Sequence, residues 1–195
     1  WIQNRQLREN KKTRYMINAS LKYQLFDWLD VVGRVKIDNY DNRSTYKAYA
    51  STGTLVSGDR GTYSDTSTQS KNTYADAIAT LNKSFNDWSV NVNLGVSLSD
   101  SRYEMIGYEG GLKLINFFAV HNIDFNKAWK AKQSGWHDQT RAIFANAEIG
   151  WKSMIYLTAT GRNDWDSRLA FSDYKSFFYP SIGLSAILTP FCNTR

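Results

Sequence analysis

Cysteine, proline and long apolar runs are scarce in this sequence, and each scarcity narrows the classes of protein it can belong to. The single cysteine, Cys192, excludes an internal disulfide and a zinc site built from cysteines. Only two prolines occur in the chain, which in combination with many aromatic residues is the composition of a β-protein. No stretch approaches the roughly 18 apolar residues of a membrane-spanning helix. A barrel would escape that test, because its strands alternate between apolar and polar residues.

The residues that are abundant indicate a β-protein. Aromatic residues make up 15% of the 195 residues, and aromatic and β-branched side chains suit a pleated surface. Charged residues reach 22%, which excludes a highly charged disordered tail. Lys and Arg number 24 against 18 Asp and Glu, a net charge of +6. Because the basic residues are spread along the chain, this charge does not indicate a nucleic-acid surface.

Apolar and polar side chains alternate over much of the chain, with the period of a strand that has two different faces. The clearest segment is 88–98, where every second residue is apolar and the residues between are Ser, Asn or Gly. Ile78 and Phe144 break the pattern in two weaker segments. We count about seven strands, each near or above the ~9–11 residues of a tilted membrane-spanning strand. They lie around 15–25, 31–37, 75–85, 88–98, 141–151, 154–162 and 178–188.

Short and long connections alternate between these segments. Tight turns are expected at 25–29, 85–88 and 150–154, whereas long polar excursions occupy 41–73 and 100–140 and a shorter one 163–175. Outer-membrane barrels have short periplasmic turns and long extracellular loops. Aromatic residues near the tight turns would form an interfacial girdle. These residues are Tyr23, Phe26, Trp28, Phe85, Trp88, Trp151 and Tyr156.

The patterns together predict an all-β fold, a segment of a large antiparallel transmembrane β-barrel with about seven strands, short periplasmic turns and long extracellular loops. A bacterial barrel closes with an even number of strands, at least about 8, and an unpaired edge in lipid is prohibitive. Residues 1–195 are therefore predicted to form part of a larger barrel. The chain opens without an initiator Met or a leader, so we expect a processed product or an internal piece of a longer protein.

Three stretches carry motifs. The first is 145–165, which ends in Arg162-Asn163-Asp164-Trp165; the second is Phe177-Phe178-Tyr179-Pro180-Ser181; the third, 117–122, has two Phe residues followed by an Asn. Together they resemble a late barrel segment of the SusC/RagA family of TonB-linked outer-membrane transporters, over roughly 114–188. Asp166 stands where the family would have Ser.

The resemblance implies import of a bulky nutrient, a glycan fragment or an oligopeptide, across the cell outer membrane. In the family, the barrel holds a plug, a SusD-like surface lipoprotein caps it, and TonB couples import to the inner-membrane proton gradient. The implied partners are outer-membrane lipid, the other strands and plug of the same transporter, the lipoprotein and TonB, with no nucleic acid. No plug domain can be placed in residues 1–195, and 190–195 lack the aromatic-ended strand expected to finish a barrel.

The alternation assigns some side chains to the lumen of such a barrel: Lys22, Arg34, Lys36, Asn91, Asn93, Ser97 and Glu148. Aromatic residues in the expected loops are candidates for contacts with substrate or a partner, although packing of the loops against each other is an equally open alternative. They are Tyr46, Tyr49, Tyr63, Trp129 and Trp136. A structural role, with Trp165 as an interfacial anchor, is expected for the motif residues Arg162, Asn163, Asp164, Trp165, Tyr179 and Pro180.

The sequence contains few residues that indicate catalysis. His121 and His137 belong to no catalytic or metal-binding motif and are expected to be solvated loop residues. Asp164 and Asp166 could suggest the pair of carboxylates that a glycosidase uses. The simpler explanation is that they hydrogen-bond to turn amides or bind an ion weakly. We therefore predict no enzyme activity, no catalytic residue, no metal site and no cofactor. Two other classes remain open: a non-transporting outer-membrane barrel (an adhesin or a porin), and a soluble carbohydrate-binding β-sandwich.

Overall fold

The computed structural model describes residues 4–53 and 57–187, so Cys192, Leu188 and the segment 190–195 considered above lie outside the described residues, as do Trp1 and Ile2. Seven strands and three short 3-10 helices make up the described chain. The strands are β1 (Gln6–Phe26), β2 (Leu29–Ala48), β3 (Thr62–Phe85), β4 (Trp88–Gly111), β5 (Trp129–Trp151), β6 (Ile155–Asp166) and β7 (Phe177–Ala186). The 3-10 helices are η2 (Ala50–Thr52), η3 (Val120–Asn122) and η4 (Ser167–Leu169).

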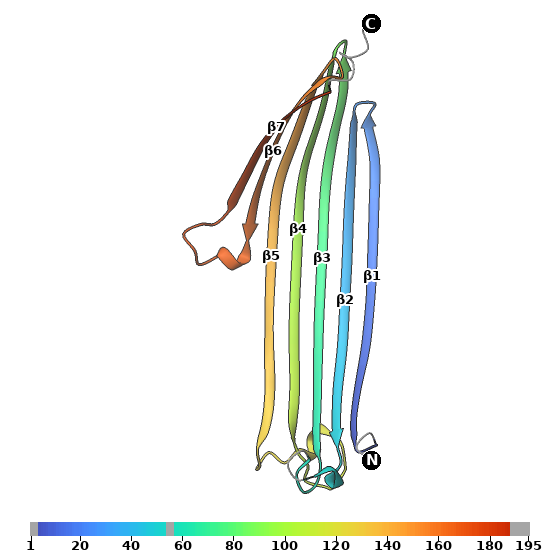
Figure 1. Cartoon of the computed structure of the whole chain (residues 1–195), viewed down its shortest axis with the longest axis vertical. Helices are drawn as coiled ribbons and strands as arrows, with labels where there is room; N and C mark the ends of the chain where they lie inside the picture. The colour runs from blue at the N-terminus through green and yellow to red at the C-terminus, as the bar shows by residue number, and fades with distance from the viewer. Residues whose placement is uncertain (1–3, 54–56, 188–195) are drawn as a thin grey trace. The chain divides into compact units, whose positions relative to one another are not determined.

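All seven strands belong to one antiparallel sheet, in which each strand lies beside the next in the chain, in the order β1-β2-β3-β4-β5-β6-β7 (Figure 1). Each of the seven alternating segments corresponds to one of these strands, although the segments at 154–162 and 178–188 are not wholly contained in β6 and β7. The predicted all-β fold and the number of strands are confirmed. The sheet is not closed: β1 and β7 each have one neighbour within the described chain.

The long connections are shorter than the sequence indicates, because the strands continue into the polar segments that were expected to be loops. β2 reaches Ala48 and β3 begins at Thr62, so much of 41–73 is strand. β4 likewise reaches Gly111, and β5 begins at Trp129. Residues in these parts are polar on both faces, so alternation gives no signal there, although each strand keeps its partners for backbone hydrogen bonds.

The three tight turns are confirmed, and they lie at the same end of the strands that they join (Figure 1). Lys152 and Ser153 both have positive φ, at 51° and 56°, and the Met154 N–H donates to the Trp151 carbonyl at 2.9 Å. This is the geometry of a type I′ turn, whose twist matches that of the strands it joins. Asn86 has a φ of 48° in the turn between β3 and β4, a conformation that Asn tolerates well.

The described chain divides into two compact units, and each of β1 to β5 contributes residues to both. The first unit comprises Trp1–Met16, Asp38–Lys71 and Ser101–His137. It holds a small hydrophobic core of Tyr63, Leu112 and Ile123. The second unit comprises Ile17–Ile37, Asn72–Asp100 and Asp138–Arg195. Its strands form a single layer, so most of its large apolar side chains are exposed.

Candidate lipid and lumen faces

The pairing of β5, β6 and β7 places the predicted apolar residues on one side of the sheet. Ile149 pairs with Leu157, and Leu157 pairs with Leu184. Directly paired residues of antiparallel strands point to the same face, so each row of pairs shares a face. We call this side the apolar face; in these strands it holds Ile143, Ala145, Ala147, Ile149, Ile155, Leu157, Ala159, Gly161, Phe178, Pro180, Ile182, Leu184 and Ala186.

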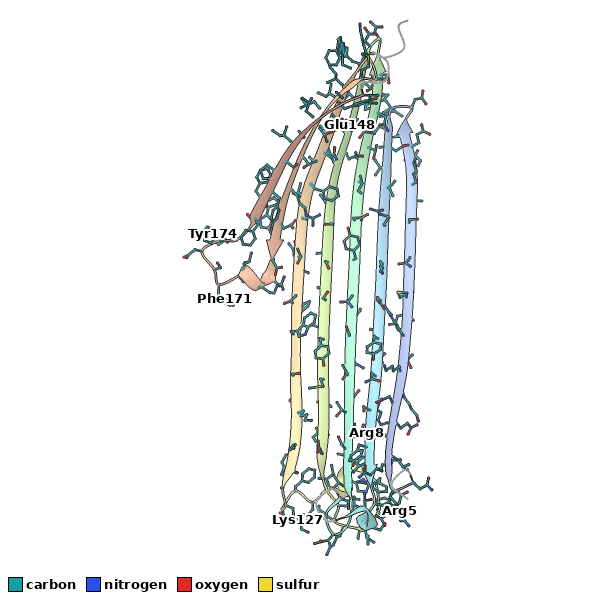
Figure 2. All side chains as sticks on the ribbon, in the orientation of Figure 1. Arg5, Arg8, Lys127, Glu148, Phe171 and Tyr174 are labelled. Atoms are coloured by element: carbon teal, nitrogen blue, oxygen red, sulfur yellow. The ribbon has the colours of Figure 1, made fainter. Side chains whose placement is uncertain are left out.

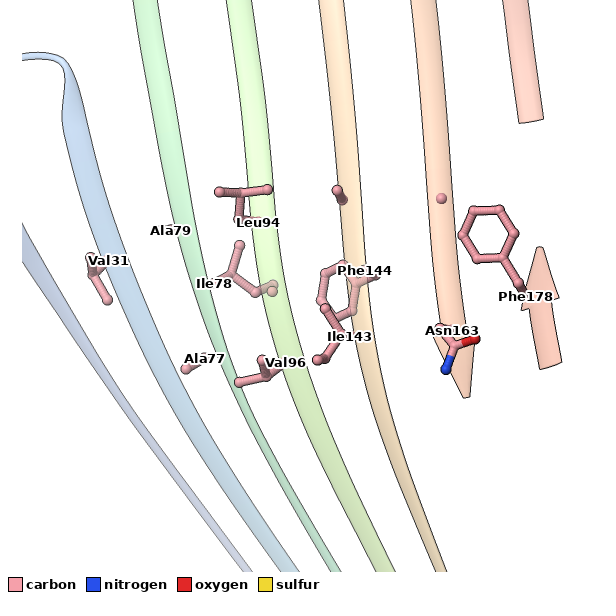
Figure 3. Close-up of a pocket in the computed structure, with 13 residues that line it drawn as sticks. Val31, Ala77, Ile78, Ala79, Leu94, Val96, Ile143, Phe144, Asn163 and Phe178 are labelled. Atoms are coloured by element: carbon pink, nitrogen blue, oxygen red, sulfur yellow. The ribbon is translucent and has the colours of Figure 1, made fainter. Parts of the chain in front are cut away.

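The apolar face continues across β2, β3 and β4. A shallow depression brings together Val31, Leu94, Val96, Ile143 and Phe178 from neighbouring strands (Figure 3). Nothing in the described chain covers these side chains: Leu94 is 49% exposed and Val96 50% exposed. A contiguous, uncovered apolar surface that spans several strands marks contact with a membrane or another protein.

The opposite side of the second unit, the polar face, carries ion pairs between strands. Arg34 on β2 donates two hydrogen bonds of 2.8 Å to Asp76 on β3, whose side chain is 1% exposed. The Lys22 Nζ atom lies 3.1 Å from a carboxylate oxygen of Asp30, within the hairpin of β1 and β2. Charge-assisted bidentate pairs of the Arg34–Asp76 kind are the strongest hydrogen bonds available to side chains.

Amide and hydroxyl groups continue the polar face over β3 and β4. The Thr80 hydroxyl donates to Asn93 at 2.8 Å, and Asn93 donates to Asn91 at 2.8 Å. Asn91 in turn donates to Asn82. Two predicted lumen residues, Asn91 and Asn93, are therefore hydrogen-bonded to each other and to side chains of β3.

The other predicted lumen residues lie on the same face. Lys36 borders a shallow depression with Arg34 and Asp76. Glu148 accepts a hydrogen bond of 3.5 Å from the hydroxyl of Thr158, its pairing partner on β6. Ser97 follows Asn93 by an even number of residues along β4, so its side chain leaves the strand on the same side.

The two residues that break the alternation lie on the polar face, and the structure explains one of them. The ring of Phe144 on β5 covers Gly95 on β4. The Arg162 guanidinium lies 5.8 Å from the centre of the same ring. A glycine that leaves room for an aromatic ring on the next strand is a known way of filling a sheet surface. Ile78 is half-buried on β3, and no contact explains its position.

The motif residues are divided between the two faces by the alternation of β6 and β7. Arg162 donates to Asp164 at 2.6 Å on the polar face, where Tyr179 pairs with Arg162. Asn163 and Trp165 point to the apolar face, as does Pro180 opposite Gly161. The backbone at the end of β6 is capped by Asp166, which accepts a hydrogen bond of 2.9 Å from the Arg168 N–H. Capping thus comes from the residue after the motif, and Arg162 bonds to a side chain.

The five candidate contact aromatics are not all in loops. Tyr46, Tyr63, Trp129 and Trp136 lie in strands, and Tyr49 alone lies in a connection. Tyr63 is only 5% exposed, which leaves no ring face for a ligand. Trp136 stacks on Tyr103 with ring centres 6.0 Å apart and remains 49% exposed.

The other candidates contact neighbouring side chains in the first unit. Tyr49 packs edge-on against Phe118 at 4.9 Å between ring centres. Trp129 packs in the same manner against Phe125 at 4.9 Å. The Arg8 guanidinium lies 5.0 Å from the centre of the Tyr46 ring. Each of these three rings thus packs against a side chain of the first unit.

A residue that sequence reasoning did not select, Asn122, organises the connection between β4 and β5. It is 3% exposed, and its side chain accepts from the Leu114 N–H at 3.0 Å and donates to the Leu114 and Phe117 carbonyls at 2.9 and 2.7 Å. The motif of two Phe residues followed by this Asn was the available signal. The ring of the adjacent His121 contacts the Phe117 ring, with ring centres 5.5 Å apart.

The part of the chain that the structure describes contains no group of three His, Cys, Asp or Glu side chains placed to bind a metal ion. Asp164 and Asp166 each bond to a different arginine, Arg162 and Arg168. His137 lies in β5 and not in a loop. Among residues 4–53 and 57–187, no helix is long and apolar enough to cross a membrane.

In the first unit, charged side chains of β2 and β3 pair with each other. Arg43 donates hydrogen bonds of 3.0 and 2.6 Å to Asp65. These bonds hold the pKa of the Asp65 carboxyl below its usual range. Burial raises the pKa of Tyr63, which bonds to the same carboxylate at 3.3 Å.

No protein-family model matches the sequence, and no curated protein matches it. Solved structures do match the fold. The RagAB peptide transporter superposes with a TM-score of 0.88 at 14% sequence identity. The RagAB peptide importer superposes in its open-open state with a TM-score of 0.89 at 13% identity, and in its closed-closed state with 0.87 at 14%.

Each of these matches covers 100% of this chain but 22% of the solved chain, so the chain spans about a fifth of the length of those proteins. At this level of identity the likeness concerns the fold. The resemblance to SusC/RagA transporters is thus confirmed in the fold, which is that of part of a transporter barrel.

Proposed function

We propose that this chain is part of the barrel wall of a TonB-dependent nutrient importer in the outer membrane, and that it has no enzymatic role. The observation that carries the proposal is one sheet with an uncovered apolar face on one side and a hydrogen-bonded polar face on the other. A soluble sandwich would cover its apolar face with a second sheet. A barrel wall instead presents that face to lipid and its polar face to the lumen.

The lengths of the two short strands support the proposal that the apolar face contacts the membrane. β6 has 12 residues and β7 has 10. At about 3.3 Å per residue and a tilt of about 40°, such strands cover a depth of about 25–30 Å, close to the ~25 Å apolar band of outer-membrane barrels.

The free edges of β1 and β7 require other strands of the same barrel. An unpaired edge exposes backbone N–H and C=O groups that lipid cannot satisfy. We infer that the missing strands and a plug belong to the longer protein that contains this chain. The ion pairs and amides of the polar face would then line the lumen around the plug.

The matched structures are described as peptide importers, which favours an oligopeptide as cargo, with a glycan fragment as the other class. On the same basis the partners of the complete protein are a SusD-like surface lipoprotein, TonB and outer-membrane lipid. A lipoprotein cap is the partner that the resemblance to SusC/RagA transporters favours, by analogy at the level of the fold.

The test uses the complete protein that contains this chain, in its own cells and in cells lacking its gene. We expect the protein in the outer-membrane fraction and uptake of a fluorescent oligopeptide that stops when an uncoupler collapses the proton gradient. Uptake that survives the uncoupler would identify a passive porin. Surface binding without uptake would identify an adhesin, and recovery in the soluble fraction would refute the membrane assignment.

A further inference from the structure

The connection between β6 and β7 (167–176) carries two aromatic side chains that nothing in the described chain covers. Phe171 is fully exposed, at 104%, and Tyr174 is 71% exposed. Figure 2 shows both side chains on the connection, pointing away from the strands. An apolar ring left in water costs free energy, so two such rings on one connection indicate that something covers them.

Part of the backbone of this connection is hydrogen-bonded. Asp166 accepts from the Arg168 N–H, the Ala170 N–H donates to Ser167 at 3.1 Å, and the Ser172 N–H donates to Leu169 at 2.9 Å. The Ser167 hydroxyl accepts from the Gln139 N–H at 2.9 Å, which ties the connection to β5. Each backbone group that is bonded within the protein lowers the penalty for entering a region poor in water.

The connection follows directly from the apolar face. Trp165 is 40% exposed and points to that face at the end of β6, and Phe178 lies on it at the start of β7. Since β6 and β7 span about the depth of the apolar band, the connection begins where that band ends. Rings of Trp, Tyr and Phe are favoured at this depth, because their apolar bodies contact acyl chains while polar groups reach water.

Two of the three charged residues of the connection are basic, and the third is Asp173. Lys175 is exposed next to Tyr174, and Arg168 is held beside Asp166 by hydrogen bonds of 3.0 and 2.7 Å. Cations placed among interfacial aromatics attract the phosphates of anionic lipids.

We propose that the connection 167–176 is an interfacial anchor, with Phe171 and Tyr174 inserted among the headgroups of the outer leaflet and Lys175 beside their phosphates. This inference rests on the proposed barrel. It assigns lipid, and not the surface lipoprotein or the plug, as the partner of these residues.

The test places a nitroxide label at three positions of the complete protein, one at a time, in a background with Cys192→Ser. The labelled variants are Phe171→Cys, Leu157→Cys on the apolar face and Lys127→Cys, which is exposed on the connection between β4 and β5. The protein is reconstituted in vesicles of phosphatidylcholine and phosphatidylglycerol. Collision rates with oxygen, which concentrates in lipid, and with a water-soluble nickel chelate are then measured.

We expect oxygen to collide more often than the chelate at positions 171 and 157, and less often at 127. A label at 171 that favours the chelate would show a water-exposed connection and overturn the anchor. Low collision rates with both reagents at 171 would show protein cover and overturn it as well. If the label at 157 also failed to report lipid, the barrel assignment itself would be wrong, which separates the two failures.

Discussion

The ring of Phe144 lies so close over Gly95 that a Cβ atom built on Gly95 would overlap the ring carbons. The two residues sit on neighbouring strands of the polar face, far apart in sequence. An aromatic residue in a polar stretch is therefore matched by a glycine on the adjacent strand.

Gly95→Ala is expected to destabilise the barrel by about 1–3 kcal/mol, because the ring must move to admit the methyl group. The measurement is the urea midpoint of the complete protein in detergent. The effect should shrink in a Phe144→Ala background, since the two changes share one contact. Gly33→Ala is the control, because a Cβ there meets nothing within 4 Å. Equal effects at positions 33 and 95 would contradict the contact.

Leu94→Arg should block assembly in the membrane, whereas Asn93→Arg should be tolerated. An arginine facing lipid at mid-depth costs about 2–4 kcal/mol. The loss at Asn93 is limited to its hydrogen bonds with Thr80 and Asn91, each worth about 1 kcal/mol. Assembly is followed by heat-dependent mobility in gel electrophoresis. Equal tolerance at the two positions would refute the assignment of the faces.

Arg34→Ala is expected to lower stability more than the double change Arg34→Ala with Asp76→Ala. The single change leaves the Asp76 carboxylate, whose side chain is 1% exposed, without its bidentate partner. Removing both groups also removes the stranded charge. Urea midpoints of the two variants decide the order, and a double variant less stable than Arg34→Ala would argue against the pair as described.

Asn122→Ala should loosen the connection between β4 and β5 without dissolving the sheet. The change leaves one N–H and two carbonyl groups of that connection without their partner, a cost of about 1–3 kcal/mol. The expected result is faster cleavage within 112–128 by protease added to intact cells. Asn126→Ala is the matched control, since Asn126 is exposed and only its backbone N–H makes a resolved bond, to Asp124. Equal cleavage rates in the two variants would contradict the role of Asn122.

The sequence predicts the strands of the second unit well because the two sides of the sheet differ there. In 88–98 every second residue is apolar, and these residues lie on one face of β4. The turn at Phe85–Trp88 was equally clear, because two strands of this kind are joined there by very few residues. An alternation of period two is local information, readable without knowing any partner strand.

The same reasoning underestimated the strands in the first unit. Residues 62–74 of β3 are polar on both faces, so their strand character depends on partners in β2 and β4. Tyr63 likewise looked like an exposed loop aromatic, yet Leu112 and Ile123 bury it from distant parts of the chain. Such contacts have no periodic trace in the sequence.

Local patterning thus specifies which side chains of this protein share a face, because the pleat of a strand sends successive side chains to opposite sides. How far each strand extends, which carboxylate each arginine meets and where Phe144 finds its glycine depend on register between strands. Register joins residues that lie far apart along the chain, so these features emerge when the sheet is assembled.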